Sequence, residues 1–197
     1  MKAKQFDKLA KEAFGSMLQD FGFTSDQSRG CTFYRRVNDD LYHLIIPDLL
    51  RSGERYDVMV FPFCPRLDPL FSEKFPDSLG IPTGSFCYLA PSGVGPDQTL
   101  FEASSEERFF SVFNSQVAPL LKTMAVGYLD QVQSLENMLP LIRSPHQKAL
   151  ASFYVHGDAA SRVQLEQQRD RLAALDTDDK TVSAILGLIE SLLSTPA

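Results

Sequence analysis

The chain has 197 residues, a hydrophobic content of 44% and a net charge of −6 at pH 7. These values predict one globular protein with a substantial core and argue against a disordered chain. The acidic balance disfavours binding to nucleic-acid phosphates, and no apolar run approaches the roughly 20 residues of a membrane helix.

The first residues and the cysteines both indicate a cytoplasmic protein. Residues 1–8 lack the continuous apolar segment of a secretory signal. The three cysteines, Cys31, Cys64 and Cys87, are odd in number and widely spaced. That spacing argues against a disulfide framework, so we expect all three thiols to be reduced and unpaired.

The clearest pattern in the chain is an amphipathic helix over residues 3–22. Its apolar side chains recur at intervals of three and four, which places them on one face of a helix. Gly22 follows as a stop signal. We expect this face to be buried against a sheet through Phe6, Phe14, Leu18 and Phe21.

Three strands rich in β-branched and aromatic residues are predicted next, at residues 31–37, 41–46 and 55–61. Turn-forming residues separate them, at 38–40 and 51–54. The strands should form an antiparallel meander, with the first helix covering one face. With Asp39 at the centre of the first turn, His43 lies opposite Arg35.

Prolines and glycines interrupt residues 62–98 repeatedly. One short strand, at 85–89, is expected to extend the sheet. The segment is also apolar, which indicates that it packs against the rest of the protein. It is either a lid on the sheet or a loop that binds a partner, since loops held by rigid sheets often bind.

The chain is predicted to be helical from residue 104 onward. Ser104 and Glu107 have the spacing of a helix-capping box, and Pro119 is expected to break or kink the helix that follows. Further helices are predicted to start at Ser144, Asp158 and Asp179. The fold class is therefore α+β, with an α+β domain over residues 1–140 and a helical segment over 141–197.

No residue pattern in the chain has the spacing that catalysis or metal binding requires. Cys31 and His43 would lie about 13 Å apart along the hairpin, too far for a thiol–imidazole pair. There is no C-x-x-C pair for zinc, and Gly93-Val94-Gly95-Pro96 lacks the Lys-Ser/Thr of a phosphate loop. We expect no metal and no cofactor, and the sequence leans against an enzyme without deciding the matter.

Two groups of residues are candidates for binding. Arg35, Arg36 and His43 lie inside strands, so alternation places one arginine on each face of the sheet. The simpler interpretation is an edge strand whose arginine reaches water. The second group consists of aromatic residues that could anchor a partner or belong to the core: Phe71, Phe75, Phe86 and Tyr88.

The opening of the chain resembles a group of small bacterial proteins of unknown function. The resemblance is carried by Leu18-x-x-Phe21-Gly22-Phe23 at the end of the first helix and by Phe33-x-Arg35 on the first strand. It covers about the first two-thirds of the chain. Such groups include proteins encoded beside contact-dependent toxins, which implies a binding role and transfers no catalytic residue.

Two classes of function therefore stay open. The first is a binding or interaction protein, such as an adaptor or an immunity-type inhibitor, whose partner is another protein and neither a nucleic acid nor a membrane. The second is a hydrolase or transferase with a site around Arg35, His43 and the loop at 62–98. A deep pocket with convergent polar groups and perturbed pKa values would favour the enzyme.

Overall fold

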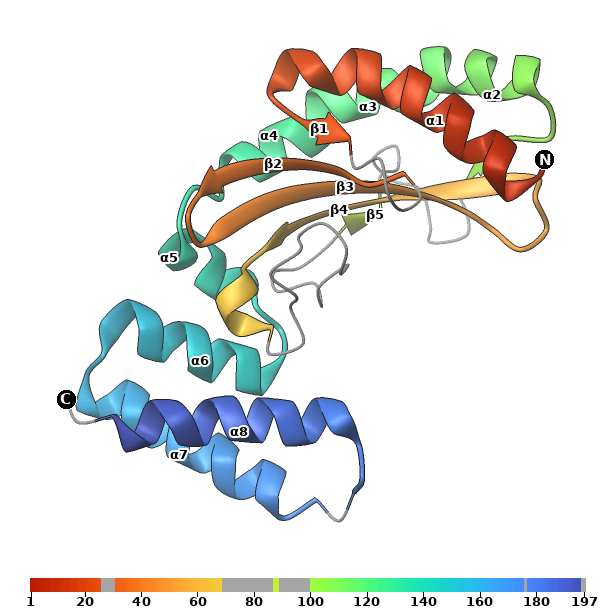
Figure 1. Cartoon of the computed structure of the whole chain (residues 1–197). Coiled ribbons are helices and arrows are strands. Elements are labelled where there is room, and N and C mark those ends of the chain that lie inside the picture. Colours follow the sequence, from red (N-terminus) through yellow and green to blue (C-terminus); the bar gives the residue numbers. More distant parts are fainter. Residues whose placement is uncertain (26–30, 69–86, 89–99, 176, 196–197) are drawn as a thin grey trace.

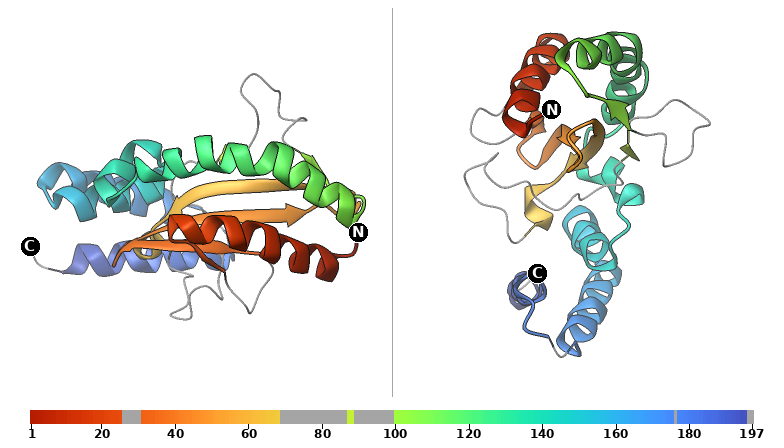
Figure 2. Two further views of the ribbon diagram at one scale, coloured as in Figure 1. Left: turned by 90° about the horizontal axis from the view of Figure 1, so that it is seen from above. Right: turned by 90° about the vertical axis from the view of Figure 1, so that its right-hand side faces the viewer.

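The computed structural model describes residues 1–25, 31–68, 87–88, 100–175 and 177–195. An antiparallel sheet forms the middle of the molecule, and two helices lie side by side over one of its faces (Figures 1 and 2). Further helices lie beyond one end of the sheet, on the other side from that pair (Figure 1). This arrangement confirms the predicted α+β class.

The elements follow the predicted order, with a helix first, then strands and then helices. Among the described residues six strands form one sheet, at Thr24–Ser25 (β1), Phe33–Asn38 (β2), Leu41–Leu49 (β3), Arg55–Phe63 (β4), Cys87–Tyr88 (β5) and Phe101–Glu102 (β6). The separate helices are Ala3–Leu18 (α1), Leu135–Met138 (α5), Pro145–His156 (α6), Ala159–Ala173 (α7) and Lys180–Ser194 (α8). One longer helix is built from Glu106–Val112 (α2), Phe113–Val117 (η4), Ala118–Leu120 (α3), Leu121–Ala125 (η5) and Val126–Asp130 (α4).

The predicted hairpin register is confirmed. Strands β2 and β3 pair antiparallel with Arg35 opposite His43. The pair next to the turn is Asn38 with Leu41, so the turn consists of two residues. Val37 is the extra residue of β2 and forms a β-bulge between the pairs made by Arg36 and Asn38. The sheet continues in the order β1-β2-β3-β4-β5, and β6 also pairs with β4.

Helix α1 buries its apolar face against the sheet as predicted. Phe6, Phe14 and Leu18 are 1%, 0% and 0% exposed. Phe21 is only half-buried, because the helix tightens into a 3-10 turn over Gln19–Phe21. Gly22 then ends the element with φ of 78°, a left-handed conformation that side chains with a Cβ rarely adopt.

Residues 106–130 run without interruption as one helix, here called the long helix, so the expected break at Pro119 does not occur. Two widened π turns, at Phe113–Val117 and Leu121–Ala125, flank this proline. The hydroxyls of Ser115 and Thr123 donate to main-chain oxygens four residues earlier and help to satisfy carbonyls along this stretch. The helix is capped by Ser105, which accepts from the Arg108 amide, and not by Ser104.

The helices after residue 130 pack on the end of the sheet through a second core. Leu41, Cys64 and Leu67 from the sheet region are 1%, 0% and 1% exposed and join side chains of the later helices. Helix α7 buries only Ser161 and Leu165, as its sparse apolar pattern predicts. No helix among the described residues has the length and apolar character that spanning a membrane would require.

Tyr56 carries a hydroxyl that the core does not satisfy. Its ring lies 5.2 Å from the ring of Phe6 and 5.6 Å from those of Phe101 and Phe109, and its side chain is fully buried. The hydroxyl has no hydrogen-bond partner within the described part of the chain, and burial raises its pKa.

We predict that Tyr56→Phe stabilises the protein. A buried hydroxyl without a partner carries a desolvation penalty of about 1–3 kcal/mol, and phenylalanine keeps the ring contacts without it. The free energy of unfolding should rise by about 1 kcal/mol in urea denaturation. A fall of similar size would mean that the hydroxyl makes a stabilising contact.

Candidate functional site

The structure brings the predicted pair Arg35 and His43 together with Asp130, at one end of the helix layer. The Nη2 atom of Arg35 lies 2.9 Å from Nδ1 of His43 and 2.5 Å from a carboxylate oxygen of Asp130. The imidazole is 0% exposed, although the sequence indicated a residue available to a substrate or partner. A histidine between an arginine and a carboxylate has the composition of a catalytic cluster, so its hydrogen bonds decide its role.

Both nitrogens of His43 are engaged in contacts that hold the fold. Nε2 lies 2.7 Å from the main-chain oxygen of Val132 and therefore carries the proton that it donates. Nδ1 then has the lone pair that accepts from Arg35. Burial lowers the pKa of His43 to about 4, and the Arg35 charge acts in the same direction. The ring is thus neutral and has no free nitrogen with which to act as a general base.

Arg35 ties four parts of the chain together. Besides His43 and Asp130, its guanidinium donates to the main-chain oxygen of Phe21 at 3.1 Å and lies over the ring of Phe23 at 4.8 Å. Its contacts reach the end of α1 and the end of the long helix. We call Arg35, His43 and Asp130 the polar tie.

The polar tie should make stability depend on acidity. Because the folded pKa of His43, about 4, lies below its ordinary value of 6.5, the unfolded chain binds protons more readily between these values. The contribution of His43 to the free energy of unfolding is fully present above pH 6.5. It decreases as the pH falls toward 4, by about 3 kcal/mol at most. Urea denaturation of the wild type and of His43→Gln at pH 7, 6, 5 and 4 measures this.

Protonation of Asp57 changes stability in the opposite direction, so its effect has to be separated from that of His43. Burial, together with Asp48 directly opposite on β3, raises the pKa of the Asp57 carboxyl to about 6. The contribution of Asp57 to the free energy of unfolding is fully present below pH 3.8, the ordinary pKa of its carboxyl. It is lost as the pH rises through 6. The His43→Gln variant should therefore lose stability less steeply than the wild type on acidification. Identical slopes would show that His43 does not titrate as described.

The other predicted site residues are not gathered around the polar tie. Arg36 is exposed and pairs with Asp39 in the hairpin turn at 2.6 Å. Phe71, Phe75 and Phe86 lie outside the described residues, and Tyr88 is described only by its pairing with Met59. These aromatic anchors therefore stay predictions.

Cys31 and Cys64, the cysteines whose side chains the structure describes, are both buried. Cys31 donates to the main-chain oxygen of Asp7 at 3.0 Å, and burial raises its thiol pKa to about 12. Burial likewise raises the pKa of Cys64 to about 11. Because the thiolate is the nucleophile, both thiols are unreactive in the folded protein. Among the described residues, His, Cys, Asp and Glu form no group of three that could hold a metal.

A groove runs along the outer surface between α1 and the long helix, which lie side by side over the sheet (Figure 2). Its volume is about 530 Å³. The ring of Phe6 lies 5.8 Å from Phe109, and that of Phe14 lies 4.9 Å from Phe113. The two helices therefore advance in the same direction, and the groove follows both. The sequence did not predict it, since it needs two helices about 100 residues apart.

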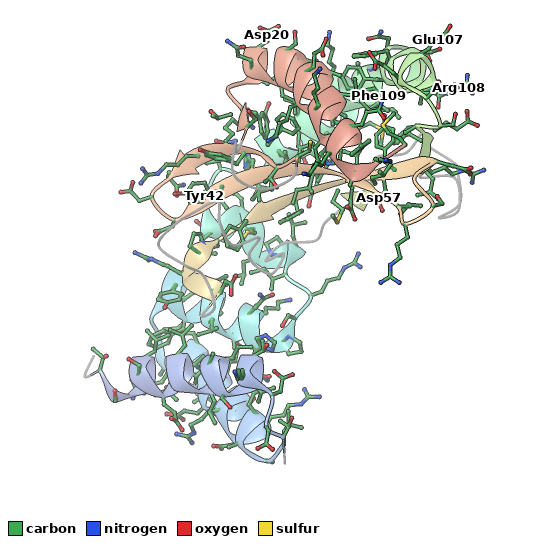
Figure 3. All side chains as sticks on the ribbon, turned by 45° about the vertical axis from the view of Figure 1, so that its right-hand side comes forward. Asp20, Tyr42, Asp57, Glu107, Arg108 and Phe109 are labelled. Atoms are coloured by element: carbon green, nitrogen blue, oxygen red, sulfur yellow. The ribbon has the colours of Figure 1, made fainter. Side chains whose placement is uncertain are left out.

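The groove is lined by both polar and apolar side chains, and charged residues stand on its rims. Met17 and Phe110 are half-buried, pack on the core from outside and leave apolar surface in the groove. Glu12 on α1 and Asp20 on the 3-10 turn that follows it form one rim, and Lys122 lies on the rim of the long helix. Figure 3 shows Asp20 on the outer side of the helix layer, away from the sheet.

No family model, curated protein or solved structure matches this chain. The resemblance to small bacterial proteins thus stays a prediction. Half-buried apolar side chains inside a charged rim, such as Met17 and Phe110 in the groove, are typical of protein-binding surfaces. The polar tie, by contrast, has the make-up of a structural network.

Two smaller hollows lie among the later helices. One, of about 380 Å³, is bordered by Lys148 and Ser152 of α6 and by glutamines of α7. The other, of about 390 Å³, lies between Phe153, Leu192 and the start of α7. In the second hollow Arg162 is engaged with the Leu193 main-chain oxygen and with Glu166. Neither hollow gathers reactive groups.

Proposed function

We propose that the protein is a binding module that recognises another protein through the groove between α1 and the long helix. The observation that carries the proposal is that the potentially reactive side chains of the protein are buried, whereas the charged side chains of the groove are exposed. His43, Cys31 and Cys64, which could support catalysis, are buried and hydrogen-bonded within the fold. The charged groups of the groove, Glu12, Asp20 and Lys122, face solvent and form no ion pair among the described residues.

The position of the groove supports the same proposal. Partner-binding surfaces combine apolar anchors with a polar rim, and the groove offers half-buried Met17 and Phe110 inside a rim of charges. Its walls are rigid elements, because α1 and the long helix are packed on the sheet through a shared aromatic core. A rigid surface loses little conformational freedom on association.

The hydrolase or transferase alternative would require His43 to leave its present contacts. The imidazole would have to lose the Val132 bond or the Arg35 bond and become accessible from its fully buried position. The perturbed pKa of His43 is the feature that favours an enzyme, but burial within a structural network produces the same shift.

Affinity capture from an extract of the native cells tests the proposal. The wild type is compared with Ser16→Trp, which fills the groove from an exposed position, and with Val163→Trp, an exposed position on α7. We expect one or more proteins to be retained by the wild type and by Val163→Trp and to be lost with Ser16→Trp. Equal capture by all three, no capture, or a substrate-saturable turnover abolished by His43→Gln would contradict the proposal.

A further inference from the structure

We propose that the groove receives an amphipathic helix with two basic residues about two turns apart, an inference that rests on the proposed function. The walls of the groove favour a partner whose main chain is already hydrogen-bonded. Both walls of the groove are helices, whose main-chain groups are bonded internally, so they offer an extended peptide no strand edge. A helical partner satisfies its own main chain and needs only side-chain contacts from the groove.

The walls of the groove include small side chains, among them Ser16 on α1 and Ala118 on the long helix. Beside them Met17 and Phe110 supply apolar surface. Helices pack at 8–10 Å when the side chains at the contact allow a close approach. Met17 and Phe110 can therefore contact the apolar stripe of an amphipathic helix, and the polar groups of the groove can contact the polar side chains beside that stripe.

Glu12 on α1 and Asp20 on the 3-10 turn that continues it both border the groove. They are eight residues apart, which is about 12 Å along a helix. Lysine or arginine residues seven or eight positions apart on the incoming helix span the same distance and meet both carboxylates. Lys122 stands alone on the opposite rim and favours an acidic or neutral residue there. This asymmetry fixes the side of the incoming helix that faces α1, since complementary charges set orientation and encounter rate.

The two π turns of the long helix also support docking of a partner in the groove. Both π turns, at Phe113–Val117 and Leu121–Ala125, contribute residues to the groove. Such turns frequently lie at functional sites. Asn114 and Lys122, which belong to these turns, line the same wall as Ala118.

The probe is a display library of random 18-residue peptides selected on the folded full-length protein, with removal of peptides that also bind Ser16→Trp. We expect the enriched peptides to have a helical apolar period and a net positive charge, with basic residues seven or eight positions apart. Fluorescence anisotropy then measures the best peptide against variants whose fold is checked by circular dichroism and urea denaturation. Glu12→Lys combined with Asp20→Lys should weaken binding about tenfold, because two attractive pairs become repulsive.

The control is Glu190→Lys, which reverses an exposed charge on α8 and should leave affinity unchanged. Enrichment of acidic or extended peptides, no enrichment, or equal loss in the control overturns the basic helix as the occupant. If groove-dependent capture from cell extract persists in that case, the proposed function stands and only the partner chemistry fails. If both fail, the groove is not a binding surface.

Discussion

Replacing Phe14 with alanine should lower the free energy of unfolding by about 3–5 kcal/mol, the range for removing a fully buried phenylalanine. The ring is 0% exposed and stacks on Phe33 of the sheet at 5.7 Å. It also contacts Phe113 of the long helix at 4.9 Å. One side chain therefore joins three elements, and its loss leaves a cavity at their junction.

Urea denaturation followed by circular dichroism measures this change. The matched control is Lys8→Ala on the exposed side of the same helix, which should change stability by less than about 0.5 kcal/mol. A loss below about 1 kcal/mol for Phe14→Ala would contradict the burial of α1 on the sheet. Because α1 forms one wall of the groove, we also expect Phe14→Ala to weaken capture of a partner.

Replacing Arg35 with alanine should lower the free energy of unfolding by about 2–4 kcal/mol. The substitution leaves Nδ1 of buried His43 without its donor, at a cost of about 1–3 kcal/mol. It also removes the bond to the Phe21 main-chain oxygen and the contact with the Phe23 ring. The ion pair with Asp130 adds little, because that carboxylate is half-exposed.

Arg36→Ala is the matched control for Arg35→Ala. The two arginines are neighbours on β2, but Arg36 is exposed and pairs only with exposed Asp39 and its own turn. We expect a change within about 0.5 kcal/mol for Arg36→Ala. Similar losses for both arginines would show that the polar tie does not exist as described.

The polar tie and the groove are connected through the same two helices. Arg35 bonds the last turn before Gly22, at the end of α1, and Asp130, at the end of the long helix. These helices are the walls of the groove. A network that is too buried to act on a substrate thus sets the spacing of the surface that we propose binds a partner.

The sequence predicted local structure well because neighbouring residues determine it. The stripe of α1 and the opposition of Arg35 and His43 follow from periodicity and from a short turn. The chain could not reveal Asp130, which is 95 residues from Arg35 and lies next to it only after the long helix packs on the sheet.

Two other features, the continuity of the long helix and the groove, could not be predicted from the sequence for related reasons. The long helix continues through Pro119 with a widened turn on each side of it, and helix propensities do not predict such turns. The groove depends on how two helices align over the sheet. Its residues, such as Glu12 and Lys122, appear in the sequence as ordinary solvent-facing charges.

Site-specific photo-crosslinking in the native cells tests most directly whether the groove is the binding surface. A photo-reactive phenylalanine analogue is placed at Ser16, in the groove, or at Val163, which is 49% exposed on α7. We predict a discrete adduct with one partner protein from position 16 and none from position 163. An adduct from position 163 alone, the same adduct from both positions, or none from either would contradict it.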